Sequence, residues 1–298
     1  MKQQAKGTAA LLAATVIWGF AFIAQSVGME KIGPFTFQAI RCALAVIFLF
    51  PAATLLDLRK MSIKQAIAMW ADRKLLKTGI ICGCALFIAS SLQQIGLVYT
   101  DAGKAGFITA MYIVLVPILG IFLGRKAPKA AWVSVCLAVL GLYLLSCTGI
   151  GGINIGDICL MGCALAFAVQ ITCIDRLAGD LDGMRLNCIQ AATVILLSLP
   201  FVFLTETVRV ENIVSCWGAL CFAGILSMGV AYTLQIVGQK ELEPTTASLI
   251  MSLESVFAAL GGWWLLQETM TLPEFSGCIL VFAAVLISQL PQRKEYHD

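Results

Sequence analysis

The sequence predicts an all-α integral membrane protein with ten transmembrane helices, arranged as two inverted five-helix repeats. Only 12% of the 298 residues are charged, 60% are hydrophobic and the mean hydropathy is +0.92, whereas about a quarter of a soluble protein's residues are charged. Ten apolar stretches have the length of about 20 residues that a helix needs to cross a hydrocarbon core about 30 Å thick. The second five stretches also repeat features of the first five.

In the first half, we expect each stretch to be a helix, because an open strand edge finds no hydrogen-bond partner in lipid. The expected spans are residues 8–28, 34–56, 77–99, 103–123 and 130–147. The first is too long for the apolar core of a signal peptide and further spans follow, so we expect no cleavable signal. The basic segment 57–76 lies between spans two and three, and its sequence MSIKQAIAMWADRK is expected to connect them, either as a plain connector or as a short amphipathic helix at the membrane surface.

In the second half, the expected spans are residues 155–174, 184–204, 213–237, 244–266 and 272–290. The Gly-rich segment 148–156 joins the halves, so the expected organisation is a first repeat at 8–147, this linker, and a second repeat at 157–290. The linker resembles a phosphate-binding loop only in its glycine content, because no Gly-Lys-Ser/Thr follows it.

Basic residues predict the orientation. With ten spans both termini lie on one side, and 16 of the 20 Lys/Arg fall on that side. These are Lys2, Lys6, Arg59, Lys60, Lys64, Arg73, Lys74, Lys77, Arg125, Lys126, Lys129, Arg176, Arg185, Lys240, Arg293 and Lys294. The other side has Lys31, Lys104 and Arg209. The positive-inside rule therefore predicts a multi-pass protein of the cell (inner) membrane with both termini in the cytoplasm.

Two offsets superpose polar, glycine and proline residues of the two halves. At an offset of 149 residues the pairs are Gln38 and Asn187, Arg41 and Gln190, and Pro51 and Pro200. At an offset of 142 residues they include Ser90 and Tyr232, Gln93 and Gln235, Gly96 and Gly238, and Tyr112 and Glu254. Each half holds an odd number of spans, so the halves must insert in opposite orientations. Many secondary transporters share this plan and bind their substrate near the midplane between the repeats.

Three segments resemble the EamA-type transporters of the drug/metabolite transporter superfamily. They are TVIWGFAFIAQ in the first span, FQAIRCALAVIFLFP in the second, and LEPTTASLIMSLESVFAALGGWWLLQETMTLPEFSGCIL near the end. The resemblance covers roughly residues 8–290. The family's second-repeat signature usually reads Leu-Glu-Pro-Val where this chain has Leu253-Glu254-Ser255-Val256, so the kink expected from that proline is in question. The resemblance implies a carrier, and the family handles amino acids, drugs, nucleobases and other metabolites.

Glu254 is the candidate coupling residue. It lies near the middle of the ninth span, where an ionised carboxylate costs about 2.5–3.5 kcal/mol on insertion scales. A carboxylate at this depth could bind a cation or carry a proton. The alternative is that it is neutral or hydrogen-bonded to a neighbouring helix and only fixes packing.

Other polar and aromatic residues are candidates for lining a substrate cavity. Arg41 could bind a substrate carboxylate through its planar guanidinium, or extend to the interface, or pair with a structural acid. The amides could bind substrate or join helices, where such hydrogen bonds contribute about 0.6–2 kcal/mol. The candidates are Trp18, Gln25, Gln38, Arg41, Ser90, Gln93, Tyr112, Asn187, Gln190, Tyr232 and Gln235.

Several function classes are not indicated. A catalytic triad would need a histidine, and His297 is the only one and lies in the tail, so we expect no enzyme. The twelve cysteines are expected to act as small packing residues, and we expect no metal and no cofactor. A net charge of +3 follows from the topology and does not indicate nucleic acid. No segment could bind ATP, so a gradient must drive any transport.

The sequence therefore predicts a secondary carrier of small organic metabolites, such as amino acids or related compounds, that exports them by alternating access. Its expected partners are a small-molecule substrate and the lipid bilayer; proton coupling and facilitated exchange both stay open. The alternatives are an uptake carrier or solute antiporter of the same fold, and a non-transporting membrane scaffold or sensor. A scaffold has no need of polar residues repeated in both halves.

Overall fold

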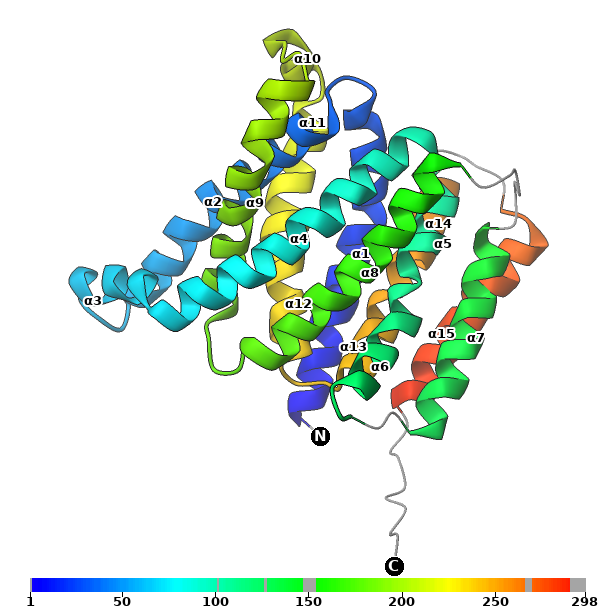
Figure 1. The fold of residues 1–298 in the computed structure, drawn as a ribbon. Helices are drawn as coiled ribbons and strands as arrows, with labels where there is room; N and C mark the ends of the chain where they lie inside the picture. Colours follow the sequence, from blue (N-terminus) through cyan, green and yellow to red (C-terminus); the bar gives the residue numbers. More distant parts are fainter. Residues whose placement is uncertain (1, 101, 126–127, 147–153, 266–269, 290–298) are drawn as a thin grey trace, which may run out of the picture.

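A computed structural model describes residues 2–100, 102–125, 128–146, 154–265 and 270–289, all of them helical or in short connections (Figure 1). The helices of the first half are α1 (Lys2–Met29), α2 (Pro34–Leu58), α3 (Ile63–Ala68), η1 (Met69–Ala71), α4 (Arg73–Tyr99), α5 (Ala102–Ala110), α6 (Tyr112–Phe122) and α7 (Lys129–Ser146). Those of the second half are α8 (Ile155–Leu177), α9 (Gly183–Thr205), α10 (Val210–Ser215), α11 (Trp217–Cys221), η2 (Phe222–Ala231), α12 (Tyr232–Gln239), α13 (Pro244–Met251), α14 (Leu253–Leu265) and α15 (Leu272–Gln289).

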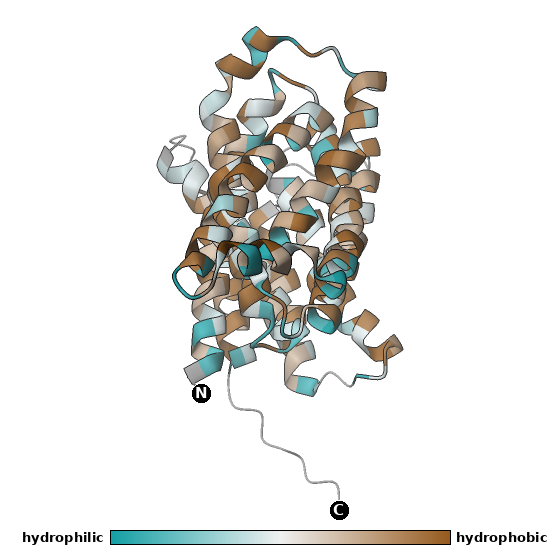
Figure 2. Cartoon of the chain, turned by 90° about the vertical axis from the view of Figure 1, so that its left-hand side faces the viewer, coloured by the Kyte–Doolittle hydropathy of each residue, from teal (hydrophilic) through white to brown (hydrophobic). Residues whose placement is uncertain are grey.

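The helices confirm the predicted fold class. Among the described residues, nine helical segments are long and apolar enough to cross a membrane, and the shorter apolar helix Lys129–Leu145 supplies the tenth span. Figure 2 shows hydrophobic residues along most of these helices and hydrophilic residues mainly near their ends and in the connections. Most of the predicted linker 148–156 lies outside the described residues. The predicted connector 57–76 contains α3, whose N-cap is Ser62; the backbone N–H of Ser62 donates to the side chain of Gln65.

The two halves pack with related neighbours. In the first half α1 lies against η2, α12 and α14, and in the second half α8 lies against α4, α5 and α6. α2 pairs with α9, and α7 pairs with α15 at one edge of the bundle (Figure 1). The main neighbours of α1 and α8, and the α2–α9 and α7–α15 pairs, therefore match a twofold relation between inverted repeats.

The outer surface of the bundle is apolar and its interior holds polar side chains. Leu196 and Phe203 are 70% and 79% exposed, as expected for side chains that face lipid. In contrast, Gln38, Gln170 and Gln190 are fully buried. A buried amide in a membrane protein must bond to another part of the chain, so these side chains mark the interior as the place to search for a site.

The contact between α7 and α15 depends on two glycines. A Cβ atom on Gly277 would lie 2.5 Å from the carbonyl oxygen of Gly141, and one on Gly141 would lie 2.8 Å from that of Gly277. Small residues let the two backbones approach, which is how membrane helices gain dispersion energy without a hydrophobic driving force.

We therefore predict that Gly277→Ala lowers the free energy of unfolding by about 1–3 kcal/mol, the usual cost of overpacking. The measurement is thermal unfolding of the purified protein in detergent. Gly218→Ala is the matched control, because nothing lies within 4 Å of a Cβ atom at this helical glycine. Equal melting temperatures for the two variants would contradict the assignment.

Candidate functional site

A cavity lies between the two halves, with about 480 Å³ of space not filled by atoms, part of which is open to solvent. Helices of both repeats contribute to its wall. The lining residues are Trp18, Phe22, Gln25, Arg41, Gln93, Tyr112, Phe167, Ile171, Ser227, Tyr232, Gln235, Met251 and Glu254. The cavity therefore combines aromatic and aliphatic side chains with one cation and one carboxyl group.

Two spans, each made of two consecutive helices, bring Tyr112 and Glu254 together. Span four passes from α5 to α6 at Met111, and span nine passes from α13 to α14 at Ser252. Both residues keep right-handed helical backbone angles, and each span is continuous over a membrane-crossing length. The Ser252 hydroxyl donates to the carbonyl oxygen of Leu249. The change of helix at Ser252 is present although the chain has Ser255 where the family's signature has proline.

Glu254 and Tyr112, which are repeat-equivalent, are hydrogen-bonded. The Tyr112 hydroxyl donates to Oε1 of Glu254 at 3.2 Å, and the Glu254 residue is only 8% exposed. No basic side chain forms an ion pair with Glu254 in the part of the chain that the structure describes. A carboxyl group here can accept or release a proton, or bind a cation that enters the cavity.

Arg41 is held by amide side chains. Its Nη1 donates to Oε1 of Gln25 at 2.8 Å and its Nη2 donates to Oε1 of Gln38 at 2.7 Å. Arg41 is 2% exposed, and no carboxylate among the described residues forms an ion pair with it. Its Nε has no hydrogen-bond partner. The guanidinium therefore carries into the cavity wall a charge that no carboxylate of the described residues neutralises.

The second half contains a related network without a charge. Gln170 donates to Gln190 at 3.2 Å and accepts from Gln235 at 3.2 Å. Gln190 is the repeat equivalent of Arg41, so the cation of one half corresponds to an amide in the other. Oε1 of Gln235 has no partner and belongs to a residue that lines the cavity.

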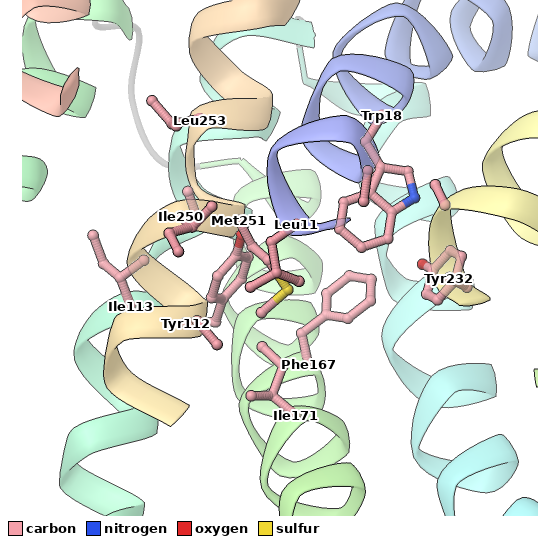
Figure 3. Packing of buried hydrophobic residues seen from close by; sticks show 14 of the residues in the cluster. Leu11, Trp18, Tyr112, Ile113, Phe167, Ile171, Tyr232, Ile250, Met251 and Leu253 are labelled. Carbon is pink, nitrogen blue, oxygen red and sulfur yellow. The ribbon is translucent and has the colours of Figure 1, made fainter. Parts of the chain in front are cut away.

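Aromatic rings form much of the remaining wall (Figure 3). Trp18 and Tyr232 meet edge to face with their ring centroids 5.0 Å apart, and Phe167 lies near them in the close-up view. Tyr112 and Phe167 make a similar contact at 6.4 Å. The indole N–H of Trp18 is buried and has no hydrogen-bond partner among the described residues.

The structure separates the twelve sequence-predicted residues into two groups. Eight line the cavity: Trp18, Gln25, Arg41, Gln93, Tyr112, Tyr232, Gln235 and Glu254. The remaining four, which are Gln38, Ser90, Asn187 and Gln190, are buried between helices. Gln38 donates to Ser90 at 2.5 Å and supports Arg41, so it acts through a residue of the wall. The side-chain amide of Asn187 donates to the carbonyl oxygens of Met228 and Gly229. Both belong to η2, which ends directly before Tyr232.

Sequence reasoning missed several residues of the site. Phe167, Ile171, Ser227 and Met251 line the cavity, and Gln94 and Gln170 take part in the amide networks. One signal could have found two of them, because an offset of 145 residues places Phe22 on Phe167 and Gln25 on Gln170. Ser227 lies in the π-helix η2, and no sequence pattern that we recognise predicts that segment.

Comparison with known proteins identifies what the chain is similar to. The model of the EamA-like transporter family matches it twice, at residues 5–147 and 154–289. An uncharacterized transporter of Archaeoglobus fulgidus is 32% identical over 278 residues, covering 92% of this chain and 83% of that protein. The uncharacterized transporter YoaV of Bacillus subtilis is 22% identical over 288 residues, covering 93% and 94%.

Two further matches are more limited in what they indicate. The threonine/homoserine exporter RhtA of Escherichia coli is 28% identical over 186 residues, which are 59% of this chain and 60% of the exporter. A solved crystal structure superposes with a TM-score of 0.78 over 95% of this chain and 96% of its own, at 17% sequence identity. That likeness shows the fold alone.

The two amide networks predict different energetic consequences for equivalent changes. Gln25→Leu leaves Nη1 of Arg41 and Nε2 of Gln94 without an acceptor, whereas Gln170→Leu leaves only neutral amide groups without partners. Hydrogen bonds to charged groups contribute about 1.5–3 kcal/mol and neutral ones about 1 kcal/mol. We therefore expect Gln25→Leu to reduce the free energy of unfolding more than Gln170→Leu. Thermal unfolding of both variants tests this, and an equal or reversed order would show that Arg41 does not depend on Gln25.

Proposed function

This chain belongs to the EamA-like transporter family, and from that premise we propose that it is a secondary carrier exporting small organic metabolites that bear a carboxylate, such as amino acids or related compounds, by alternating access. It is a multi-pass membrane transporter, and a small-molecule substrate and a lipid environment follow from the family. The observation that carries the proposal is the buried Arg41 guanidinium, which lines the central cavity, lies over the Phe37 ring and, among the described residues, donates hydrogen bonds to amide oxygens but to no carboxylate.

A substrate carboxylate supplies what Arg41 lacks. Burying a guanidinium is costly unless an opposite charge compensates it, and Gln25 and Gln38 offer only amide oxygens. A guanidinium binds a carboxylate through two parallel hydrogen bonds, and the buried Nε of Arg41 has no partner among the described residues. Binding of the carboxylate would therefore give the guanidinium the opposite charge that Gln25 and Gln38 do not supply.

Glu254 has the opposite need: when ionised, its carboxylate requires a positive charge or a proton. Its carboxyl group is bonded to the Tyr112 hydroxyl and lines the same cavity as Arg41. In the proposed cycle it either carries a proton or binds a cationic group of the substrate. Trp18, Tyr232 and Phe167 give the intervening wall an apolar character suited to the carbon skeleton of a metabolite.

Two observations support export as the direction of transport. The name of RhtA describes export of threonine and homoserine, and that exporter matches part of this chain. The bias of 16 basic residues to three supports cytoplasmic termini in the inner membrane. Uptake or exchange of two solutes by the same cavity is the alternative, because site geometry alone is independent of the direction of flux. A scaffold or sensor is disfavoured, since it has no need of an unneutralised charge in a cavity.

We predict that Arg41→Gln abolishes binding of carboxylate metabolites while the protein still folds, because Gln190 occupies the equivalent place in the second repeat. The measurement is a thermal-shift panel of amino acids, organic acids and amines, since a ligand stabilises the folded state by about 2.7 kcal/mol at 100 times its dissociation constant. Arg41→Lys is the control that keeps a charge but loses the planar geometry, and it should bind more weakly than wild type. A carboxylate that stabilises wild type and Arg41→Gln equally would remove Arg41 from the binding role.

For the coupling role, we predict that Glu254→Gln keeps fold and substrate binding but loses the pH dependence of transport, because an amide retains the shape and hydrogen bonding of the group without titrating. Exchange of substrate in the absence of a gradient should persist, since it needs no net protonation cycle. Transport into proteoliposomes at several pH values measures both. An unchanged pH dependence in the folded variant would leave Glu254 with a packing role.

A further inference from the structure

α2 and α9 are repeat-equivalent helices that run antiparallel as neighbours, and each is fastened to the other at both ends. At one end, Glu206 follows the last residue of α9 and accepts the backbone N–H of Phe35 at 2.8 Å and of Thr36 at 2.8 Å. The Thr36 hydroxyl donates to the same carboxylate at 2.6 Å. Because the first N–H groups of a helix have no intrahelical acceptor, this carboxylate from α9 serves as the cap of α2.

Gly33 makes that cap possible. It occupies the N-cap position of α2, where it has no side chain to satisfy the free N–H groups. A Cβ atom there would lie 2.2 Å from Cδ of Glu206, so any other residue would displace the carboxylate. The start of α2 is therefore built to receive a group from α9.

At the opposite end, Asp57 in the last turn of α2 forms an ion pair with Arg185 in the first turn of α9. The Arg185 side chain is buried, and its guanidinium lies over the Trp70 ring with the Cζ atom 5.5 Å from the ring centroid. Asp182 is a more distant second partner, 3.6 Å from Nη1 of Arg185. This end is thus held by a buried charge pair and an aromatic ring.

These two fastenings are copies of one arrangement. The offset of 149 residues that relates Arg41 to Gln190 also places Asp57 on Glu206 and Thr36 on Arg185. In each half, a carboxylate at the end of the second helix holds the beginning of the equivalent helix of the other half. The partners differ, since one carboxylate binds backbone N–H groups and the other binds a guanidinium, so the two ends can be released separately.

We propose that Asp57 and Glu206 are positioning residues of the transport cycle, each closing one end of the α2–α9 pair, and that the two fastenings release in turn as the cavity opens to either side. The inference rests on the proposed function, because only a carrier that works by alternating access needs both ends to open. Arg41 and Gln190 lie on α2 and α9 between the two fastenings, so a movement at either end is transmitted to the wall of the cavity and its supporting network. Packed elements of this kind exchange between discrete arrangements and do not deform continuously.

Hydrogen exchange of the full-length protein in lipid nanodiscs tests this. In Glu206→Gln we expect the amides of the first turn of α2 to exchange roughly tenfold faster, the loss expected for one charge-assisted hydrogen bond. At the same time, the amides at the far end, in residues 57–62 and the first turn of α9, should exchange more slowly. Asp57→Asn should give the reverse pattern. The matched controls are Glu211→Gln and Glu243→Gln, which alter exposed carboxylates elsewhere on the chain and should change neither end.

In each variant, the exchange rate at the unmutated end of the α2–α9 pair distinguishes a role in the transport cycle from a role in holding the fold. If each variant loosens its own end and leaves the other unchanged, or loosens both ends, the fastenings only hold the fold and the proposal is overturned. Should Glu206→Gln fail to fold, Thr36→Val removes only the hydroxyl donor and must give the same pattern more weakly. These measurements need no ligand, so one end can loosen while the other tightens in the two variants even if Arg41 binds no carboxylate. Conversely, if the wild-type protein transports a carboxylate but the variants do not show this opposite response of the two ends, only the present inference is refuted.

Discussion

The exclusion of water from the bilayer interior is the constraint on which this structure depends. An unpaired polar group in lipid costs several kcal/mol, so the amide side chains inside the bundle must bond to one another or to the backbone. Gln25, Gln38 and Gln94 do so around Arg41, and Gln170, Gln190 and Gln235 do so in the other half. The helices are therefore joined through polar residues as well as through the apolar side chains that pack between them, such as Leu86, Ile113 and Val281.

The two repeats differ at the positions that give the cavity wall its ionisable groups, which are Arg41 in the first half and Glu254 in the second. The inverted halves supply equivalent positions, and at each of two such pairs one half has a neutral side chain where the other has an ionisable one. Gln190 stands where the other half has Arg41, and Tyr112 stands where the other half has Glu254. A symmetric frame thus carries an asymmetric site, which a substrate with distinct ends requires.

The same duplication also places equivalent helices of the two halves side by side around the site, as the α7–α15 and α2–α9 pairs show. Close glycine contacts hold α7 to α15, whereas polar contacts at the ends hold α2 to α9. A backbone contact through glycines depends on a fixed distance and resists displacement. A hydrogen bond at a helix end can instead be exchanged for water, since the ends lie near the membrane surface. The contacts at the two ends of α2 and α9 are the ones that the proposed transport cycle would release.

The sequence by itself determined the ten spans, their two-repeat organisation and most of the residues that line the cavity. Lipid forces long apolar runs to become helices, and the repeat marks unusual polar residues such as Gln93 and Gln235, so both can be read along the chain. Only the tertiary structure decided that Gln38 and Asn187 point between helices while Gln93 and Gln235 reach the cavity. It also decided that apolar residues such as Phe167 and Met251 face the site, and that Asp57 and Glu206 meet the opposite helix. The physical reason is that composition and spacing fix which side chains must avoid lipid, whereas the angles at which the helices cross decide what each of them touches.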